Sequence, residues 1–176
     1  MDWTDTLFEL IDMRSFSSLW YWVALAVAWS TASHWILGVP FDMITRARRH
    51  EGQAQIDLED ITRININRLL MIGRVSGLWL LGFVAFAHTA LLLLAFWYWV
   101  ELAQAVELIA LPMTFVGFLS LAAARGIEQD TLEGEALRRR LMRHRFWVQL
   151  IGMLAIFVTA MFGMYQNFVF APGFGF

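Results

Sequence analysis

Long stretches without a charged residue alternate with polar segments along this chain, and several are long enough to cross a membrane. The clearest stretch, residues 75–100, would form a helix about 39 Å long, whereas a bilayer core is about 30 Å thick. Residues 15–41, 108–124 and 146–176 are also free of charge. The pattern predicts an all-α integral membrane protein with four transmembrane helices, at about residues 16–39, 74–100, 106–125 and 146–170.

Composition agrees with this prediction and leaves room for a single membrane domain, residues 1–176. Hydrophobic residues make up 59% of the chain and charged residues 16%, whereas a soluble domain has roughly 45–50% and about 25%. Residues 2–14 alternate acidic and apolar positions at helical spacing, which predicts a short N-terminal interfacial helix. Because this stretch has acids where a signal peptide has basic residues, we expect the first span to remain as an anchor.

Two polar segments between the spans, residues 42–72 and 126–145, are expected to form helices outside the bilayer. In the first segment, a helix that begins near Asp57 is expected to continue into the second span. In the second segment, Asp130 and Glu133 form the pattern of a capping box, which predicts a short separate helix.

Arginine placement predicts the orientation of the chain. Every one of the 13 basic residues is an arginine, and only Arg14 lies outside the two polar segments and their edges. Positively charged loops stay in the cytoplasm, so both segments are predicted to be cytoplasmic and both termini periplasmic. The connection at residues 101–107 is short and acidic, which agrees with an outside location. The third span is the shortest, so it either begins before Glu107 or lies in thinned bilayer.

Small residues at helical spacing indicate where spans pack closely. Gly73 and Gly77 form a GxxxG pattern, and alanines recur every fourth residue in the first span. Such positions allow close approach of two helix backbones, which is the main source of attraction between helices in lipid. The residues predicted to mediate helix packing are Gly73, Gly77, Ala24, Ala28 and Ala32.

His34 and His88 are the histidines inside the predicted spans, and they are the candidates for an intramembrane polar site. Counted along their helices, they differ in depth by about 12 Å, so they are not expected to ligate one haem iron together. No carboxylate is predicted deep in a span. Cysteine is absent, which excludes disulfides, thiol catalysis and cysteine-ligated clusters. We therefore expect no catalytic residue, no cofactor and no metal site.

Arginine clusters in the polar segments are the candidate contact surface. Their positive charge favours the cytoplasmic side of the membrane and so helps to fix the orientation of the chain. The same charges are also suited to docking a cytoplasmic protein or anionic lipid. The net charge of −2 argues against a nucleic-acid partner. The residues assigned to docking or lipid contact are Arg46, Arg48, Arg49, Arg138, Arg139, Arg140 and Arg143.

Two sequence segments, FELIDMRSFSSLWYW and SHWILGVPFDM, carry a resemblance that covers mainly residues 8–43. Here the chain resembles a group of alphaproteobacterial inner-membrane proteins, some of which are labelled "component of SufBCD complex". The resemblance implies a link to iron–sulfur cluster assembly. Without cysteine, this chain would act there as a membrane anchor or adaptor and not as a cluster scaffold.

These observations together predict a non-enzymatic accessory or scaffold subunit of a larger assembly in the bacterial inner membrane. Its expected partners are the lipid bilayer, other membrane subunits or a second copy of itself, and a cytoplasmic protein. The alternatives are a homo-oligomeric channel or small-solute carrier with His88 lining the path, and a membrane anchor linked to iron–sulfur cluster assembly.

Overall fold

Helices make up nearly all of the structure, a computed structural model that describes residues 16, 18–50 and 52–169. Three of these helices are long and apolar enough to cross a membrane: Gln53–Trp97, Glu101–Gln129 and Gly134–Phe168. They correspond to the second, third and fourth predicted spans, and the first of them ends at Trp97, three residues before the predicted end of the second span. The predicted interfacial helix at residues 2–14 lies outside the described residues.

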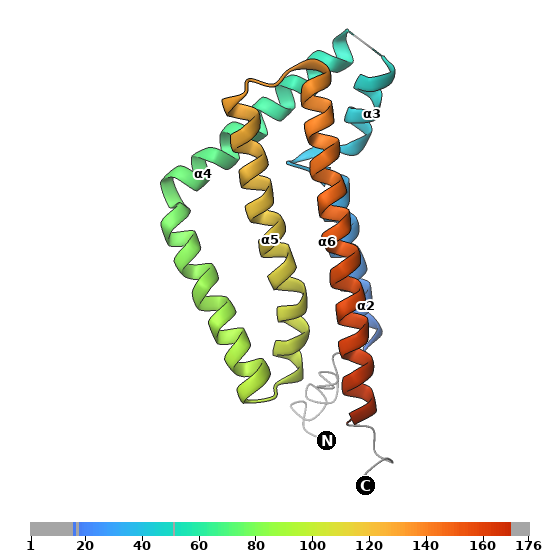
Figure 1. The fold of residues 1–176 in the computed structure, drawn as a ribbon, viewed down its shortest axis with the longest axis vertical. Coiled ribbons are helices and arrows are strands. Elements are labelled where there is room, and N and C mark those ends of the chain that lie inside the picture. The colour runs from blue at the N-terminus through green and yellow to red at the C-terminus, as the bar shows by residue number, and fades with distance from the viewer. Residues whose placement is uncertain (1–15, 17, 51, 170–176) are drawn as a thin grey trace, which may run out of the picture.

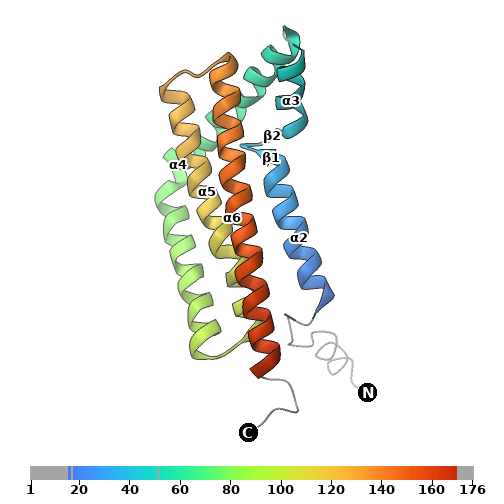
Figure 2. The same ribbon diagram turned by 45° about the vertical axis from the view of Figure 1, so that its right-hand side comes forward.

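The long helices lie side by side, with α5 between α4 and α6, and α2 packs along α6 (Figures 1 and 2). Because α4 contacts mainly α5, it stands at the edge of the group, and its apolar surface is largely exposed. In chain order the elements are α2 (Leu19–His34), β1 (Trp35–Ile36), β2 (Val39–Pro40), α3 (Phe41–Arg49), α4 (Gln53–Leu92), the π-helix η2 (Leu93–Trp97), α5 (Glu101–Gln129) and α6 (Gly134–Val169).

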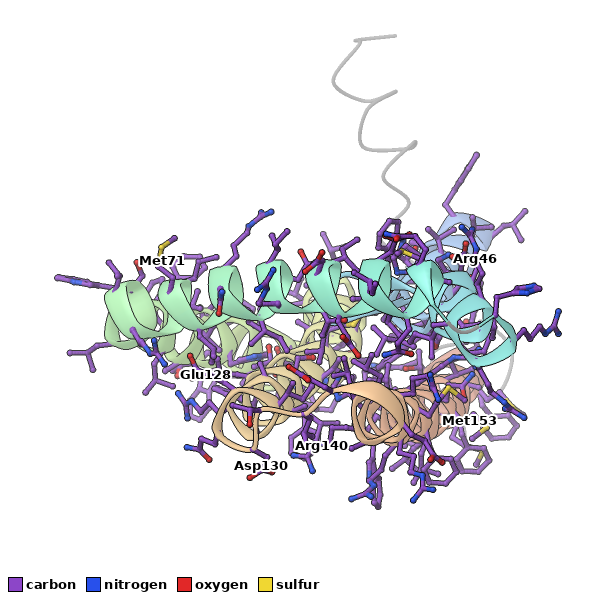
Figure 3. All side chains as sticks on the ribbon, turned by 90° about the horizontal axis from the view of Figure 1, so that it is seen from above. Arg46, Met71, Glu128, Asp130, Arg140 and Met153 are labelled. Atoms are coloured by element: carbon purple, nitrogen blue, oxygen red, sulfur yellow. The ribbon has the colours of Figure 1, made fainter. Side chains whose placement is uncertain are left out.

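Helix α4 is longer than any bilayer requires, and it bends. Its 40 residues correspond to about 60 Å of helix, twice the thickness of a bilayer core. The first part lies across the ends of α5 and α6, with Met71 at its far end (Figure 3), and the helix then turns to run along α5 (Figure 1). The prediction of one helix continuing from the polar segment into the second span is confirmed, with a start at Gln53 instead of Asp57.

The end of the first predicted span is not helical. Helix α2 ends at His34, and residues 35–40 form a small antiparallel hairpin in which Ile36 pairs with Val39. The two residues of its turn, Leu37 and Gly38, both have positive φ, as a type I′ turn requires. Asn65 of α4 donates a 3.0 Å hydrogen bond to the Gly38 carbonyl. The predicted span of residues 16–39 is thus too long at its C-terminal end.

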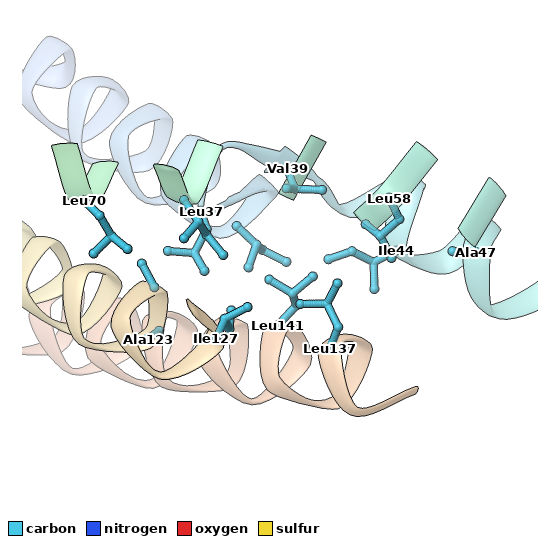
Figure 4. Packing of buried hydrophobic residues seen from close by; sticks show 13 residues of the cluster. Leu37, Val39, Ile44, Ala47, Leu58, Leu70, Ala123, Ile127, Leu137 and Leu141 are labelled. Carbon is cyan, nitrogen blue, oxygen red and sulfur yellow. The ribbon is translucent and has the colours of Figure 1, made fainter. Parts of the chain in front are cut away.

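The main hydrophobic core lies at the end of the molecule where α4 crosses α5 and α6, and not within the apolar spans (Figure 4). We call this end the head; it comprises residues 35–50, 52–71 and 123–141. Every element there contributes buried side chains, and α4 does so at a regular four-residue spacing. The core residues are Ile36, Leu37, Val39, Ile44, Ala47, Leu58, Ile66, Leu70, Ala123, Ala124, Ile127, Leu137 and Leu141.

Two predicted segments have a different structure from the one expected. Residues 101–107 are the first two turns of α5, not a connection, and Gln104 and Glu107 are buried there. The helix that corresponds to the third predicted span therefore begins before Glu107. In residues 126–145 there is no separate helix, because α5 continues to Gln129 and α6 begins at Gly134. The predicted capping box instead lies in the turn between the two helices.

Close helix packing occurs at glycines that the sequence pattern did not single out. A Cβ added at Gly152 of α6 would lie 2.7 Å from the Trp29 ring of α2. By contrast, an added Cβ at Gly77 would meet nothing within 4 Å, and at Gly73 it would meet only the Leu121 side chain, at 3.2 Å. The predicted close contact at Gly77 is therefore absent from the described structure.

The alanine stripe of the first span also differs from the prediction. Ala24 is exposed, and Ala28 and Ala32 are only half-buried. Leu25 and Trp29, one position further along, are the buried residues of α2. Because a bulky indole fits against a glycine, small residues are needed on α6 at this contact and not on α2.

Substitution by alanine distinguishes the two kinds of glycine. Gly152→Ala forces its new methyl group into the Trp29 ring and should destabilise the protein by on the order of 1–3 kcal/mol. Gly77→Ala should leave stability unchanged or slightly raised, because alanine favours helix and meets no neighbour. Melting temperatures of the purified proteins in one mild detergent test this, and equal melting of the two variants would contradict the packing described here.

Candidate functional site

His88 is the centre of a partly buried polar cluster between α4 and α5. Both of its ring nitrogens have partners on α5: Nδ1 lies 2.9 and 3.0 Å from the Glu107 carboxylate oxygens, and Nε2 lies 3.0 Å from Thr114 Oγ1. The side chains of His88 and Glu107 are only 15% and 6% exposed. Glu107 and Thr114 are separated by two helical turns, so they project from the same face of α5.

The three side chains form a continuous hydrogen-bonded chain. If the imidazole is neutral, Nδ1–H donates to Glu107 and Nε2 accepts the hydroxyl proton of Thr114. If it is protonated, both nitrogens donate, and the Thr114 hydroxyl proton is free to serve another acceptor. His88 lies about 14 Å along the helix before Trp97, so the cluster is deep within the predicted span.

The structure places Glu107 in the second turn of α5, buried against His88, and not in the expected connection between helices. The sequence pattern assigned Glu107 to an outside connection because it ends a short polar stretch. The available signal was the seven-residue spacing of Glu107 and Thr114, combined with a histidine in the preceding span. Sequence alone could not show that the two helices align these residues.

The other candidate histidine is separate from this cluster. His34 is exposed at the end of α2, where its ring meets Trp35 edge-on with the centroids 5.9 Å apart. The structure therefore does not bring His34 and His88 together, as expected from their depths. The sequence pattern did not single out His144 of α6, which is buried at 6% exposure and lies 3.2 Å from Ser120 of α5.

The arginines of the candidate contact surface divide into two groups. Arg138 is half-buried and donates hydrogen bonds to the Ala47 carbonyl and the Gln55 side chain, which ties α6 to α3 and α4. Arg140 lies against Gly126 of α5. These two were expected to be available for docking, but they are used inside the head.

The remaining arginines of the set are exposed. Arg46 pairs with Asp42 and Arg139 with Glu135, each one turn away on its own helix. Among the described residues, Arg48, Arg49 and Arg143 have no ion pair. Together these five form the exposed part of the candidate surface. Arg145, at the edge of the head, lies 3.6 Å above the Phe41 ring and bonds the Ser33 carbonyl.

Within the described part of the chain, no group of three or more histidine, aspartate or glutamate side chains is arranged to hold a metal ion. Comparison of the sequence and fold with protein-family models, with curated proteins and with solved structures finds no match. The site must therefore be interpreted from its own geometry.

The His88 cluster should be energetically coupled. His88→Leu leaves the Glu107 carboxyl without its partner, and Glu107→Leu does the same to His88, so each should lower the free energy of unfolding by on the order of 1–3 kcal/mol. The double variant should lose less free energy of unfolding than the two single variants lose together, and the difference, the coupling energy, should be about 1–2 kcal/mol. Reversible unfolding in mixed micelles measures this, with the exposed His34→Leu as the control. Additive losses would show that the pair contributes nothing.

Proposed function

We propose that this protein is a non-enzymatic accessory or scaffold subunit of a larger assembly in the bacterial inner membrane. The observation that carries the proposal is the head, a compact helical platform attached to the ends of the membrane helices. In this proposal the head faces the cytoplasm and docks a partner, while the spans anchor it and pack against neighbouring subunits or a second copy of the chain.

The construction of the head supports a docking role. Its core joins the hairpin, α3, α4, α5 and α6, and Arg138 and Glu59 add polar contacts, the latter through a 2.8 Å hydrogen bond from the Gly134 amide. A platform tied at so many points presents its outer side chains at fixed positions. Those side chains include Arg48 and Arg49, and Arg143 follows on α6 two residues beyond the head; their charges suit an acidic protein surface or anionic lipid.

Four spans with both termini in the periplasm remain the proposed topology. Helix α2 has 16 residues, about 24 Å, which is shorter than a bilayer core of about 30 Å, so in this proposal it crosses a locally thinned bilayer as a short fourth span alongside α6. Every described arginine belongs to the head or to the adjoining turns of α4, α5 and α6. The start of α2 and the end of α6 lie at the opposite end of the molecule (Figure 2), as positive-inside orientation requires.

The alternatives receive less support from this geometry. A channel path lined by His88 would need the histidine to face an open lumen, whereas both of its ring nitrogens are bonded within the helix pair. A role as a membrane anchor in iron–sulfur cluster assembly is compatible with the same platform and would be one form of the scaffold function. The scaffold function is therefore the proposal, and the identity of the partner distinguishes a general scaffold from an anchor in iron–sulfur cluster assembly.

Labelling of single cysteines tests the topology, because the natural chain has no cysteine to interfere. Leu102, near the start of α5, is 52% exposed, and Gln53, at the start of α4, is also exposed. Leu102→Cys should react with a membrane-impermeant maleimide in intact cells, and Gln53→Cys should react only after the cells are opened. Labelling in the opposite sense would overturn the orientation.

The arginines test the docking role. Replacing Arg48, Arg49 and Arg143 with glutamine removes three exposed charges that have no described ion pair, so the fold should keep its melting temperature within a few degrees. Association with the native partner, measured by quantitative mass spectrometry of the protein purified from its own membrane, should fall by about tenfold. Raising the salt concentration should weaken the wild-type association in the same way.

The matched control is Arg125→Gln, which removes an exposed charge on α5 outside the proposed surface. It should retain the partner. A triple variant that keeps every wild-type partner at high salt would remove the docking role from these arginines. A wild-type protein that purifies only as a closed ring of its own chain and conducts ions in vesicles would favour the channel.

A further inference from the structure

An apolar cavity of about 260 Å³ lies between α4 and α5 in the spanning part of the molecule. Leucine, isoleucine, valine and phenylalanine side chains form most of its wall, together with three glycines. Thr114 is the one polar side chain among the lining residues. The cavity therefore has an apolar interior with a single polar position, and that position belongs to the His88 cluster.

Two polar contacts join α4 and α5 beside this cavity. Towards the head, Arg74 of α4 pairs with Glu128 of α5 at 2.7 Å. Towards the other end, His88 joins Glu107 and Thr114. The Arg74–Glu128 pair is exposed and contributes little, so the bonds of His88 are the stronger polar link between the two helices beside the cavity.

Glycines leave the cavity open. A Cβ added at Gly77 of α4 or at Gly117 of α5 would meet no atom within 4 Å. In a chain so rich in large apolar residues, either position could have carried a filling side chain. A partner helix is 10–12 Å across and does not fit a space of this size, whereas a flat ring or a single hydrocarbon chain does.

We propose that this cavity binds the head group of a lipid-soluble quinone, with its apolar tail leaving between α4 and α5 into the bilayer. The hydrogen-bonding chain matches both forms of such a molecule. With neutral His88, the Thr114 hydroxyl donates to Nε2 and its oxygen can accept the O–H of a quinol. With protonated His88, Nε2–H donates to Thr114, whose hydroxyl proton can serve a quinone carbonyl.

Depth favours this ligand over other amphiphiles. A fatty-acid carboxylate or a phospholipid head group is charged and belongs at the membrane surface, whereas Thr114 lies within the span. A quinone is neutral, is soluble in the bilayer core and carries oxygens that need hydrogen-bond partners there. The proposal concerns binding only, and it is independent of the docking role of the head.

Binding of a short-tailed ubiquinone analogue, decylubiquinone, tests the proposal with the purified full chain in lipid nanodiscs. Extracted quinone per protein should saturate at one molecule per chain, above the background of empty nanodiscs. Gly77→Leu fills the cavity and should weaken binding about tenfold or more, and Thr114→Val should weaken it about fivefold or more. Thr114→Ser, which keeps the hydroxyl, should restore binding.

The control positions for Gly77 and Thr114 both lie on α4. Gly82 has no atom within 4 Å of an added Cβ and does not line the cavity, and Thr89 bonds only the Ala85 carbonyl one turn away. Gly82→Leu and Thr89→Val should bind like wild type. The assignment would be overturned if the quinone partitioned into the nanodiscs without saturating, or if Gly77→Leu bound it as well as the wild type does. It would also be overturned if palmitic acid or hexadecane displaced the quinone as effectively as unlabelled quinone does.

Discussion

The rest of the structure depends on the hydrophobic core of the head. Outside the bilayer, burying apolar surface stabilises a contact by roughly 25 cal/mol per Å², whereas within lipid the same burial gains little, because the surroundings are equally apolar. The fully buried side chains Leu58, Ile44 and Leu141 come from α4, α3 and α6 and meet at this end. The head thereby sets the positions from which the spanning helices begin.

Beyond the head, polar side chains define which helix lies beside which. His88 joins α4 to α5, Ser120 and His144 join α5 to α6, and Tyr21 of α2 donates to the Ala105 carbonyl of α5 at 3.2 Å. Such bonds between membrane helices are worth on average about 0.6 kcal/mol and at most about 2 kcal/mol each. They are therefore too weak to assemble the spans alone, but they select one alignment of helices that the head has already placed.

The two ends of the molecule consequently suit different tasks. The head is tightly packed and displays exposed arginines, which suits recognition of another macromolecule. The spanning part is loosely packed, with α4 contacting mainly α5, and it leaves a cavity that a tightly packed pair would have filled. A proposed docking platform and a proposed ligand site can coexist in one chain because different forces hold the two regions.

The sequence by itself determined the helical class and the three long apolar helices. It also determined that one continuous helix runs from the polar segment into the second predicted span. Each of these depends on composition or periodicity within one segment, which is local information. The same local rule failed where residues are ambiguous in isolation: residues 35–40 are apolar but form a hairpin because Gly38 turns beneath Asn65.

Only the tertiary structure decided the alignment of neighbouring helices and everything that follows from it. Along the chain Glu107 ends a short acidic stretch typical of a surface connection, yet it is buried because α5 begins at Glu101 and places it opposite His88. Arg138 has the same charge as Arg139, but its position on α6 directs it to the Ala47 carbonyl, inside the head. Gly77 and Gly152 are both glycines within long helices. The neighbouring helix alone makes Gly152 a packing contact and Gly77 part of the wall of a cavity.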